Sequence, residues 1–165
     1  MNGTDISQPL ELYRCTVLSE WIDYNHHMMD GYYGVPFSHA SDGLMTFVGL
    51  DADYRERSGC TVYTAEGHIL YLREMKEHAP IRITTQLLGF DAKRMHIFHA
   101  MYHDDDGYLA ATCEWMLIHV DPFLGKGAMM PEATLSKLAE IAAQHQLLSI
   151  PPQAGRQIGL QSKRS

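Results

Sequence analysis

The hydrophobic and polar positions of the chain divide it into five strand-like stretches and two helical ones. Residues 12–22, 60–72, 81–89, 94–103 and 108–120 are rich in β-branched, aromatic and other strand-compatible residues. Over 35–48 the apolar residues recur at helical spacing, and Gly49 stands where a left-handed cap would end a helix. Residues 131–148 form a second amphipathic helical pattern, with Pro131 near its first position.

The order of these elements predicts an α+β fold. A helix with one apolar stripe must bury it, and one face of an antiparallel sheet is the available partner. The polar stretch 51–59 predicts a connection, and the last four strands look like a meander with a tight hairpin at Asp106-Gly107. We therefore expect a five-stranded antiparallel sheet around one long helix, followed by a C-terminal helix. The open edges of such a sheet favour a homodimer joined by sheet continuation, and a tetramer is an open alternative.

Composition narrows the class of protein. The chain has 165 residues, 45% hydrophobic and 20% charged, which suits one domain over 10–148, a flexible N-terminus over 1–9 and an extended or disordered tail over 149–165. A formal net charge of −7 argues against a nucleic-acid partner, because phosphates call for a basic face. The sequence shows no secretory signal and no apolar run that could span a bilayer, so no membrane association is expected. Three dispersed cysteines favour a reducing cytoplasm.

The loop between the first strand and the first helix is the most informative stretch. Trp21-Ile22-Asp23-Tyr24-Asn25-His26-His27-Met28 sets a carboxylate, an amide and two imidazoles between two regular elements, where chemistry tends to lie. The stretch resembles the active-site loop of the hotdog-fold acyl-CoA thioesterases of the 4-hydroxybenzoyl-CoA thioesterase family, whose pattern is Asp, two residues, Gly, His, an apolar residue and Asn. Asp23, His27 and Met28 match it, whereas His26 replaces the glycine and Met29 or Asp30 the asparagine.

The resemblance extends over about 10–146 and is strongest for thioesterases that act on betainyl-CoA in carnitine breakdown. The matching segments are 20–25, 65–69 and 93–99. The resemblance implies the hotdog fold, a dimer with active sites at the subunit junction, and a catalytic acid at the position of Asp23. It implies no cofactor, since coenzyme A is part of the substrate.

Asp23 is the first candidate for catalysis. Ahead of a helix, backbone N–H groups lack intrahelical partners, and a thioester carbonyl placed there would be polarised. Asp23 could attack that carbonyl or deprotonate a water, or it could merely organise an Asx-type turn. Asn25 and His27 could orient water or the thioester, or simply hydrogen-bond the loop. The two adjacent histidines do not predict a metal site, because their side chains diverge and spacing fixes no third ligand.

Strict alternation along 60–72 would place Glu66 and His68 side by side on an otherwise apolar face. Two ionisable side chains on an apolar face must be solvated, bound to a partner of opposite charge, or functional. We therefore predict that Glu66 is catalytic and that His68 binds substrate. The alternative is a solvated surface patch. Several aromatic residues lie in the same regions of the chain, and most would simply fill a core. Some could also hold a trimethylammonium group through cation–π attraction. The aromatic residues predicted to bind substrate are Trp21, Tyr32, Tyr33, Tyr63 and Trp115.

The coenzyme A phosphates require cations, for which Lys93, Arg94, Lys126 and Arg156 are candidates and otherwise ordinary surface charges. The leading function is hydrolysis of a small acyl-CoA, with betainyl-CoA as the specific hypothesis. A hotdog enoyl-CoA hydratase or dehydratase with a histidine–acid pair is one alternative. A non-catalytic CoA-binding module is the other.

Overall fold

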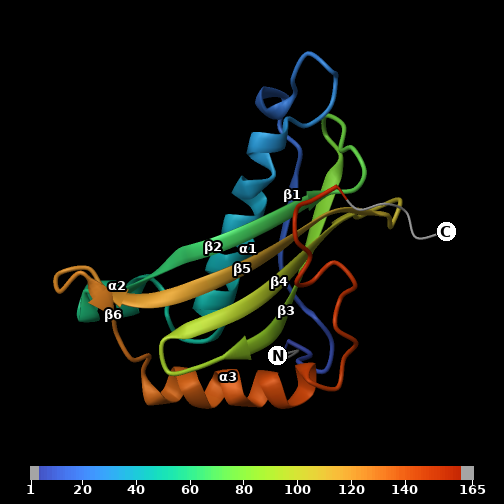
Figure 1. Cartoon of the computed structure of the whole chain (residues 1–165). Helices are drawn as coiled ribbons and strands as arrows, with labels where there is room; N and C mark the ends of the chain where they lie inside the picture. The colour runs from blue at the N-terminus through green and yellow to red at the C-terminus, as the bar shows by residue number, and fades with distance from the viewer. Residues whose placement is uncertain (1–3, 161–165) are drawn as a thin grey trace.

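One curved antiparallel sheet and a helix lying in its hollow form the body of the protein (Figure 1). The computed structural model describes residues 4–160, so residues 1–3 of the predicted N-terminal segment and 161–165 of the predicted tail lie outside the described residues. The strand order is β1-β3-β4-β5-β2, with β6 added beside β5. The strands are β1 (Leu10–Thr16), β2 (Thr61–Tyr71), β3 (Pro80–Phe90), β4 (Arg94–His103), β5 (Leu109–Asp121) and β6 (Lys126–Gly127).

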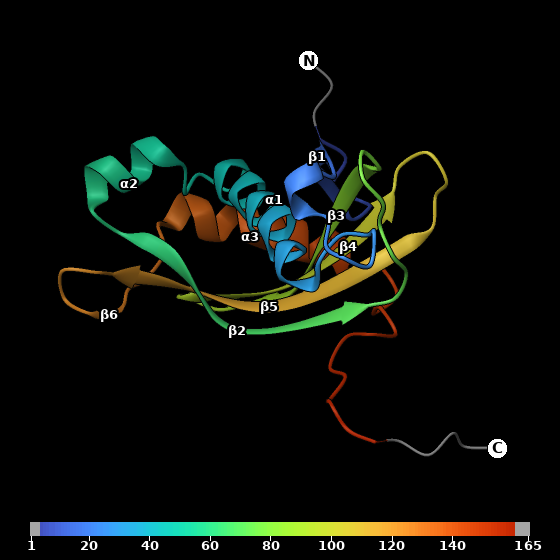
Figure 2. The same ribbon diagram turned by 90° about the horizontal axis from the view of Figure 1, so that it is seen from above.

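Helix α1 (Gly34–Phe47) confirms the predicted central helix and fills the inner face of the sheet. Its apolar stripe, with Phe37, Ala40 and Leu44 fully buried, packs against β1, β3 and β4. Gly49 takes a φ of 86°, as a left-handed cap requires. Figure 2 shows α1 on one side of the sheet and the chain after residue 148 on the other. This is the hotdog arrangement that the sequence predicted.

The first strand is shorter than predicted. β1 ends at Thr16, and residues 19–21 form the 3-10 helix η1 (Ser19–Trp21) instead of continuing to Ile22. The turn places Trp21 in the core, stacked on Tyr32 with ring centroids 6.1 Å apart. Strand propensity in this stretch is therefore overridden by burial of one large side chain.

A short helix, α2 (Ala52–Ser58), replaces the connection predicted over 51–59. The Asp51 carboxylate caps it by accepting a hydrogen bond from the Tyr54 N–H at 2.9 Å, and Gly59 ends it. None of its residues is fully buried, so it lacks the apolar stripe by which a helix is recognised in sequence. The capping residues Asp51 and Gly59 are the sequence features from which this helix could have been predicted.

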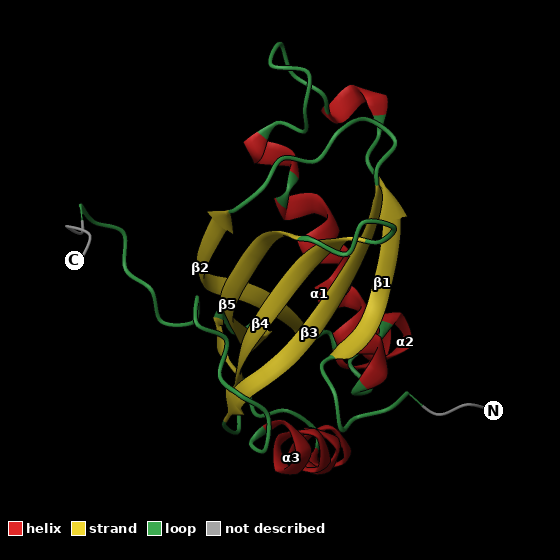
Figure 3. Ribbon diagram, turned by 90° about the vertical axis from the view of Figure 1, so that its right-hand side faces the viewer, coloured by secondary structure: helices red, strands yellow, loops and turns green. Residues whose placement is uncertain are grey.

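The predicted meander holds for β3, β4 and β5 but not for β2. β2 pairs with the far strand β5, and β1 takes the place beside β3 (Figure 3). The Asp106-Gly107 hairpin between β4 and β5 is confirmed, with φ of 72° at Gly107. β2 and β1 are consequently the two edges of the sheet. Pairing partners depend on where α1 crosses the sheet, which local sequence does not encode.

A register shift between Thr64 and Glu66 interrupts the alternation in β2. Thr64 pairs with Leu117, whose side chain is buried on the face toward α1, whereas Glu66 pairs with Met116 on the opposite face. A bulge of this kind moves every later side chain to the other side of the sheet. Strict alternation along 60–72 implied that Glu66 and His68 continue the face of Val62 and Thr64, and this prediction is wrong because of the bulge.

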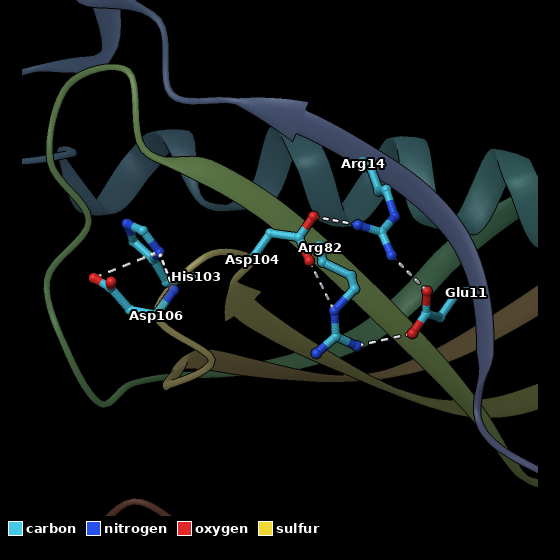
Figure 4. A network of polar contacts seen from close by, with 6 residues as sticks. All are labelled: Glu11, Arg14, Arg82, His103, Asp104 and Asp106. Atoms are coloured by element: carbon cyan, nitrogen blue, oxygen red, sulfur yellow. Dashed lines mark hydrogen bonds and ion pairs between the residues drawn. The ribbon is translucent and has the colours of Figure 1, made fainter.

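Charged side chains join β1, β3 and the start of the β4–β5 hairpin on the outer surface (Figure 4). Arg82 contacts Glu11 at 3.0 Å and Asp104 at 3.2 Å, and Arg14 pairs with the same two carboxylates. Asp104 therefore belongs to an ion-pair network that joins the edge strand β1 to β3 and to the β4–β5 hairpin.

The predicted C-terminal helix is α3 (Glu132–His145). It packs on β3 through Leu138 and Ile141, both fully buried. The Nδ1 atom of His145 accepts a hydrogen bond from the Leu87 N–H at 2.9 Å, and its Nε2 lies 3.1 Å from the Gln8 carbonyl. No helix within residues 4–160 is long and apolar enough to cross a membrane.

Candidate active site

The loop of residues 22–29 is closed on itself and anchored to the segment 72–79. A bridge pairs Ile22 with Met28, and inside it the Asp23 N–H donates to the His27 carbonyl at 3.2 Å. The Met28 N–H donates to the Met75 carbonyl at 2.7 Å. Backbone bonds on both sides thus hold the loop in one shape, as a site that orients reacting groups requires.

His26 takes a φ of 65°, in the left-handed region. It stands where the resembling family has glycine, the residue that adopts this conformation without steric cost. The departure from the family pattern therefore preserves the loop geometry, at the expense of local backbone strain.

The Asp23 carboxylate forms the Asx-type turn and also faces a cavity. Its Oδ1 accepts a hydrogen bond from the Asn25 N–H at 2.8 Å, and its Oδ2 lies 3.4 Å from the Asn25 side-chain nitrogen. The side chain is half-buried and lines the cavity wall. The turn holds the carboxylate in place, so the structural and the catalytic interpretations are compatible.

The cavity has a volume of about 470 Å³ and lies between this loop, the start of α1 and the end of β2. Figure 1 shows these segments at one end of the molecule, with α2 and β6 at the other. Three predicted site residues of the loop, together with Tyr33, meet here as expected; the lining residues that carry chemistry are Asp23, Asn25, His27, Asp30, Tyr33, Tyr71, Arg73 and Glu74.

Two tyrosines form the aromatic wall of this cavity. The rings of Tyr33 and Tyr71 meet edge to face with centroids 5.1 Å apart, and the Tyr71 hydroxyl donates to the Asp30 carbonyl at 3.2 Å. Burial raises the pKa of Tyr33 to about 12, so its phenol stays neutral at pH 7. Tyr71, Arg73 and Glu74 could not be predicted from the sequence, because only the sheet order brings the end of β2 to the start of α1.

Glu66 and His68 do not line the cavity that contains Asp23. They lie on the outer face of the sheet and line a separate cavity of about 350 Å³ with His96, Glu114 and Arg156. There His96 pairs with Glu114 at 2.7 Å, and the Gly155 N–H donates to the same carboxylate at 2.6 Å. The bulge in β2 causes this displacement, so within one chain Glu66 cannot act beside Asp23.

Most of the predicted aromatic substrate-binding residues also lie elsewhere. Trp21 and Trp115 are buried, Trp115 edge-on to His99 at 5.8 Å, and Tyr32 stacks on Trp21. Tyr63 is exposed on the edge strand β2. Of the predicted set, Tyr33 alone lines the Asp23 cavity.

The predicted coenzyme A cations are far from Asp23 within one chain. Lys93 and Lys126 lie close to the β5–β6 turn, at the opposite end of the sheet, and Arg156 lines the outer cavity. Arg94 pairs with Asp91 at 2.6 Å, which lowers the pKa of that carboxyl to about 2. None of the four lines the cavity at Asp23.

A buried polar chain fixes α1 against the sheet. His99 on β4 is fully buried, with Ser41 of α1 2.9 Å from its Nε2 and Thr85 of β3 2.9 Å from its Nδ1. Burial lowers the pKa of His99 to about 3, so the ring is neutral and offers one donor and one acceptor. It thereby sets the position of α1, whose N-cap residue Tyr33 lines the cavity.

Comparison with known proteins places this geometry in a family. A sequence model of the Thioesterase-like superfamily matches residues 17–138. A betainyl-CoA thioesterase of Pseudomonas aeruginosa is 42% identical over 94% of this chain and 98% of its own length. An L-carnitine dehydrogenase/betainyl-CoA thioesterase of a Rhizobium species is 40% identical over 92% of the chain and 30% of its own length.

A solved structure agrees with these relatives in fold and sequence. A Staphylococcus aureus protein, determined in complex with CoA, superposes with a TM-score of 0.84 and 30% identity over 90% of this chain and 94% of that one. The Asp23 loop, the hotdog fold and these matches lead to one conclusion: the chain belongs to the Thioesterase-like superfamily and is a thioester hydrolase.

Proposed function

We propose that the protein hydrolyses betainyl-CoA to betaine and coenzyme A, with Asp23 as the catalytic carboxylate. The observation that carries the proposal is the Asp23 carboxylate, held by Asn25 at the wall of a cavity beside the start of α1. The betainyl-CoA thioesterase activity named for the two sequence relatives supports the substrate. In the Rhizobium protein that activity shares a chain with L-carnitine dehydrogenase, which supports a role in carnitine metabolism.

Asp23 can act by either of two balanced routes. As a nucleophile, its oxygen forms a mixed anhydride with the acyl carbon while the thiolate leaves, and water then cleaves the anhydride. As a general base, it takes a proton from the attacking water, and the proton passes to the leaving thiolate. His27, on the same cavity wall, is available to orient water or carry that proton.

The start of α1 is the proposed electrophilic element. The first-turn N–H groups of a helix have no intrahelical acceptor and carry partial positive charge. Gly34 and Val35 supply such groups, while Pro36 has none. A thioester oxygen held there would be stabilised as it becomes negative.

A thiol-release assay over several acyl-CoAs tests this function. We expect betainyl-CoA to be hydrolysed at least as efficiently as acetyl-, butyryl- and benzoyl-CoA. Greater efficiency on the uncharged acyl groups would contradict the proposed substrate. Crotonyl-CoA tests the hydratase alternative, because hydration consumes the double bond without releasing thiol. Binding of CoA without turnover of any thioester would favour the non-catalytic alternative.

We further propose a homodimer in which two β2 strands pair. β2 is an edge strand whose central residues, 63–67, are all exposed, and an open edge of this length invites pairing. Two-fold symmetry makes such a pair antiparallel, so the Tyr71 end of one strand lies beside the Thr61 end of its partner. That end adjoins β5 and β6, so Lys126 of the partner subunit would approach the Asp23 cavity. The coenzyme A-binding role predicted for Lys93 and Lys126 depends on this dimer.

Light scattering tests the dimer. The expected mass is twice the 18.7 kDa of one chain. A fully active particle of 18.7 kDa would contradict the proposal. A tetramer would be compatible with β2 pairing within each dimer. The location of the protein in the cytoplasm, which its cysteine content favoured, stays a prediction.

A further inference from the structure

The cavity beside Asp23 is acidic and aromatic. Its lining carries the carboxylates of Asp23, Asp30 and Glu74 against the single guanidinium of Arg73. That is three negative charges and one positive, a net charge of −2 from the carboxylates and the guanidinium. Among residues 4–160 none of the three carboxylates forms an ion pair, and the Arg73 guanidinium lies over the Tyr108 ring at 3.9 Å.

Apolar rings are exposed on the same cavity wall. Tyr71 is 52% exposed and Tyr24 89% exposed, and both line the cavity. The Asp30 carboxylate is close enough to Tyr71 to contribute, after burial, to raising the pKa of that phenol. Exposed ring faces beside unpaired carboxylates suit a weakly hydrated organic cation, which gains from both the ring quadrupole and the negative charge. They suit neither an apolar acyl chain nor a phosphate.

We propose that Tyr71 and Glu74 select a quaternary ammonium acyl group, holding its cationic head while Asp23 acts on the thioester carbon. The inference rests on the proposed function, because it assumes that Asp23 marks the reacting end of the cavity. In a betainyl group one methylene separates the ammonium nitrogen from the thioester carbon. Head and reacting carbon must therefore occupy one cavity, and Asp23, Tyr71 and Glu74 share one.

Glu66, the other carboxylate predicted for the site, does not line this cavity. Glu66 lies on the outer face of the sheet, in the other cavity, where the bulge in β2 places it. Glu74 follows β2 and lines the inner cavity, and its backbone carbonyl is fixed by a hydrogen bond from the Tyr108 hydroxyl at 2.9 Å. The backbone of this segment is thus held in place, which positions the Glu74 carboxylate and leaves it free of ion pairs within the described residues.

A neutral isostere provides the test. Betainyl-CoA and 3,3-dimethylbutanoyl-CoA have nearly the same shape and differ in one atom, nitrogen against carbon, and hence in charge. The measured quantity is kcat/KM for betainyl-CoA divided by kcat/KM for the neutral isostere. Folding defects and general losses of activity affect both values equally and cancel in the ratio. We expect Tyr71→Leu and Glu74→Gln each to lower this ratio about tenfold, and Tyr71→Phe, which keeps the ring, to change it less than about twofold.

Two control variants alter equivalent groups outside the cavity. Glu77→Gln removes a carboxylate from the same segment, and Tyr102→Leu removes a ring that lines a different cavity, on the outer face of the sheet. Both should leave the ratio unchanged. A ratio that falls equally in the controls, or that stays at the wild-type value in Tyr71→Leu and Glu74→Gln, would overturn the assignment while betainyl-CoA remains the substrate. Hydrolysis of the neutral isostere but not of betainyl-CoA by the unaltered protein would overturn the proposed substrate together with it.

Discussion

Replacing Asp23 by Asn should lower kcat for thioester hydrolysis by about three orders of magnitude with the fold intact. Loss of a positioned acid–base or nucleophilic group typically costs about 10² to 10⁴ in rate. Asparagine keeps an oxygen in the place of Oδ1, so the hydrogen bond from the Asn25 N–H at 2.8 Å can still form. The Asx-type turn accepts either residue, and the substitution therefore removes the charge without removing the turn.

The measurement is single-turnover thiol release, with circular dichroism to verify folding. Asp105→Asn, at the exposed tip of the β4–β5 hairpin, is the matched control and should retain full activity. If Asp23→Asn kept a rate within a factor of ten of the unaltered protein, Asp23 would be confined to its turn and the catalytic group would have to be sought elsewhere in the cavity.

The second large effect concerns stability in acid. The pKa of His99 falls from 6.5 in the unfolded chain to about 3 in the folded protein because burial disfavours the imidazolium. Above pH 6.5 the ring is neutral in both states and stability does not depend on it. Below pH 6.5 the unfolded chain takes up a proton that the folded protein does not, so the free energy of unfolding falls by about 1.4 kcal/mol per pH unit until about pH 3.

Between pH 6.5 and pH 5.0 this single histidine should therefore remove about 2 kcal/mol of stability. Urea unfolding of the unaltered protein and of His99→Gln at both pH values measures it. Glutamine can still donate and accept between Ser41 and Thr85 but does not titrate, so the variant should lose about 2 kcal/mol less than the unaltered protein over this interval. His145, whose pKa burial also lowers, is present in both proteins and cancels. Equal losses in the two proteins would show that His99 is protonated in the folded state.

The sequence by itself determined the central helix, the β4–β5 hairpin and the chemistry of the loop. The apolar period of 35–48 identified α1 because a helix must bury one stripe, and Asp106-Gly107 identified the β4–β5 hairpin because its turn needs positive φ. Asp23, Asn25 and His27 could be predicted to share one site because they lie within five consecutive residues, which a tight turn brings to one cavity. Local interactions carry all three results.

Only the tertiary structure decided which distant residues join them. The pairing of β2 with β5 brings Tyr71 and Glu74 to the start of α1, and the bulge before Glu66 turns that carboxylate and His68 to the outer face. Neither result could be obtained from alternation, because one extra residue in a strand reverses every later side chain and strand order depends on how the whole sheet closes around α1. His99 likewise gained its role from burial, which no local pattern announces.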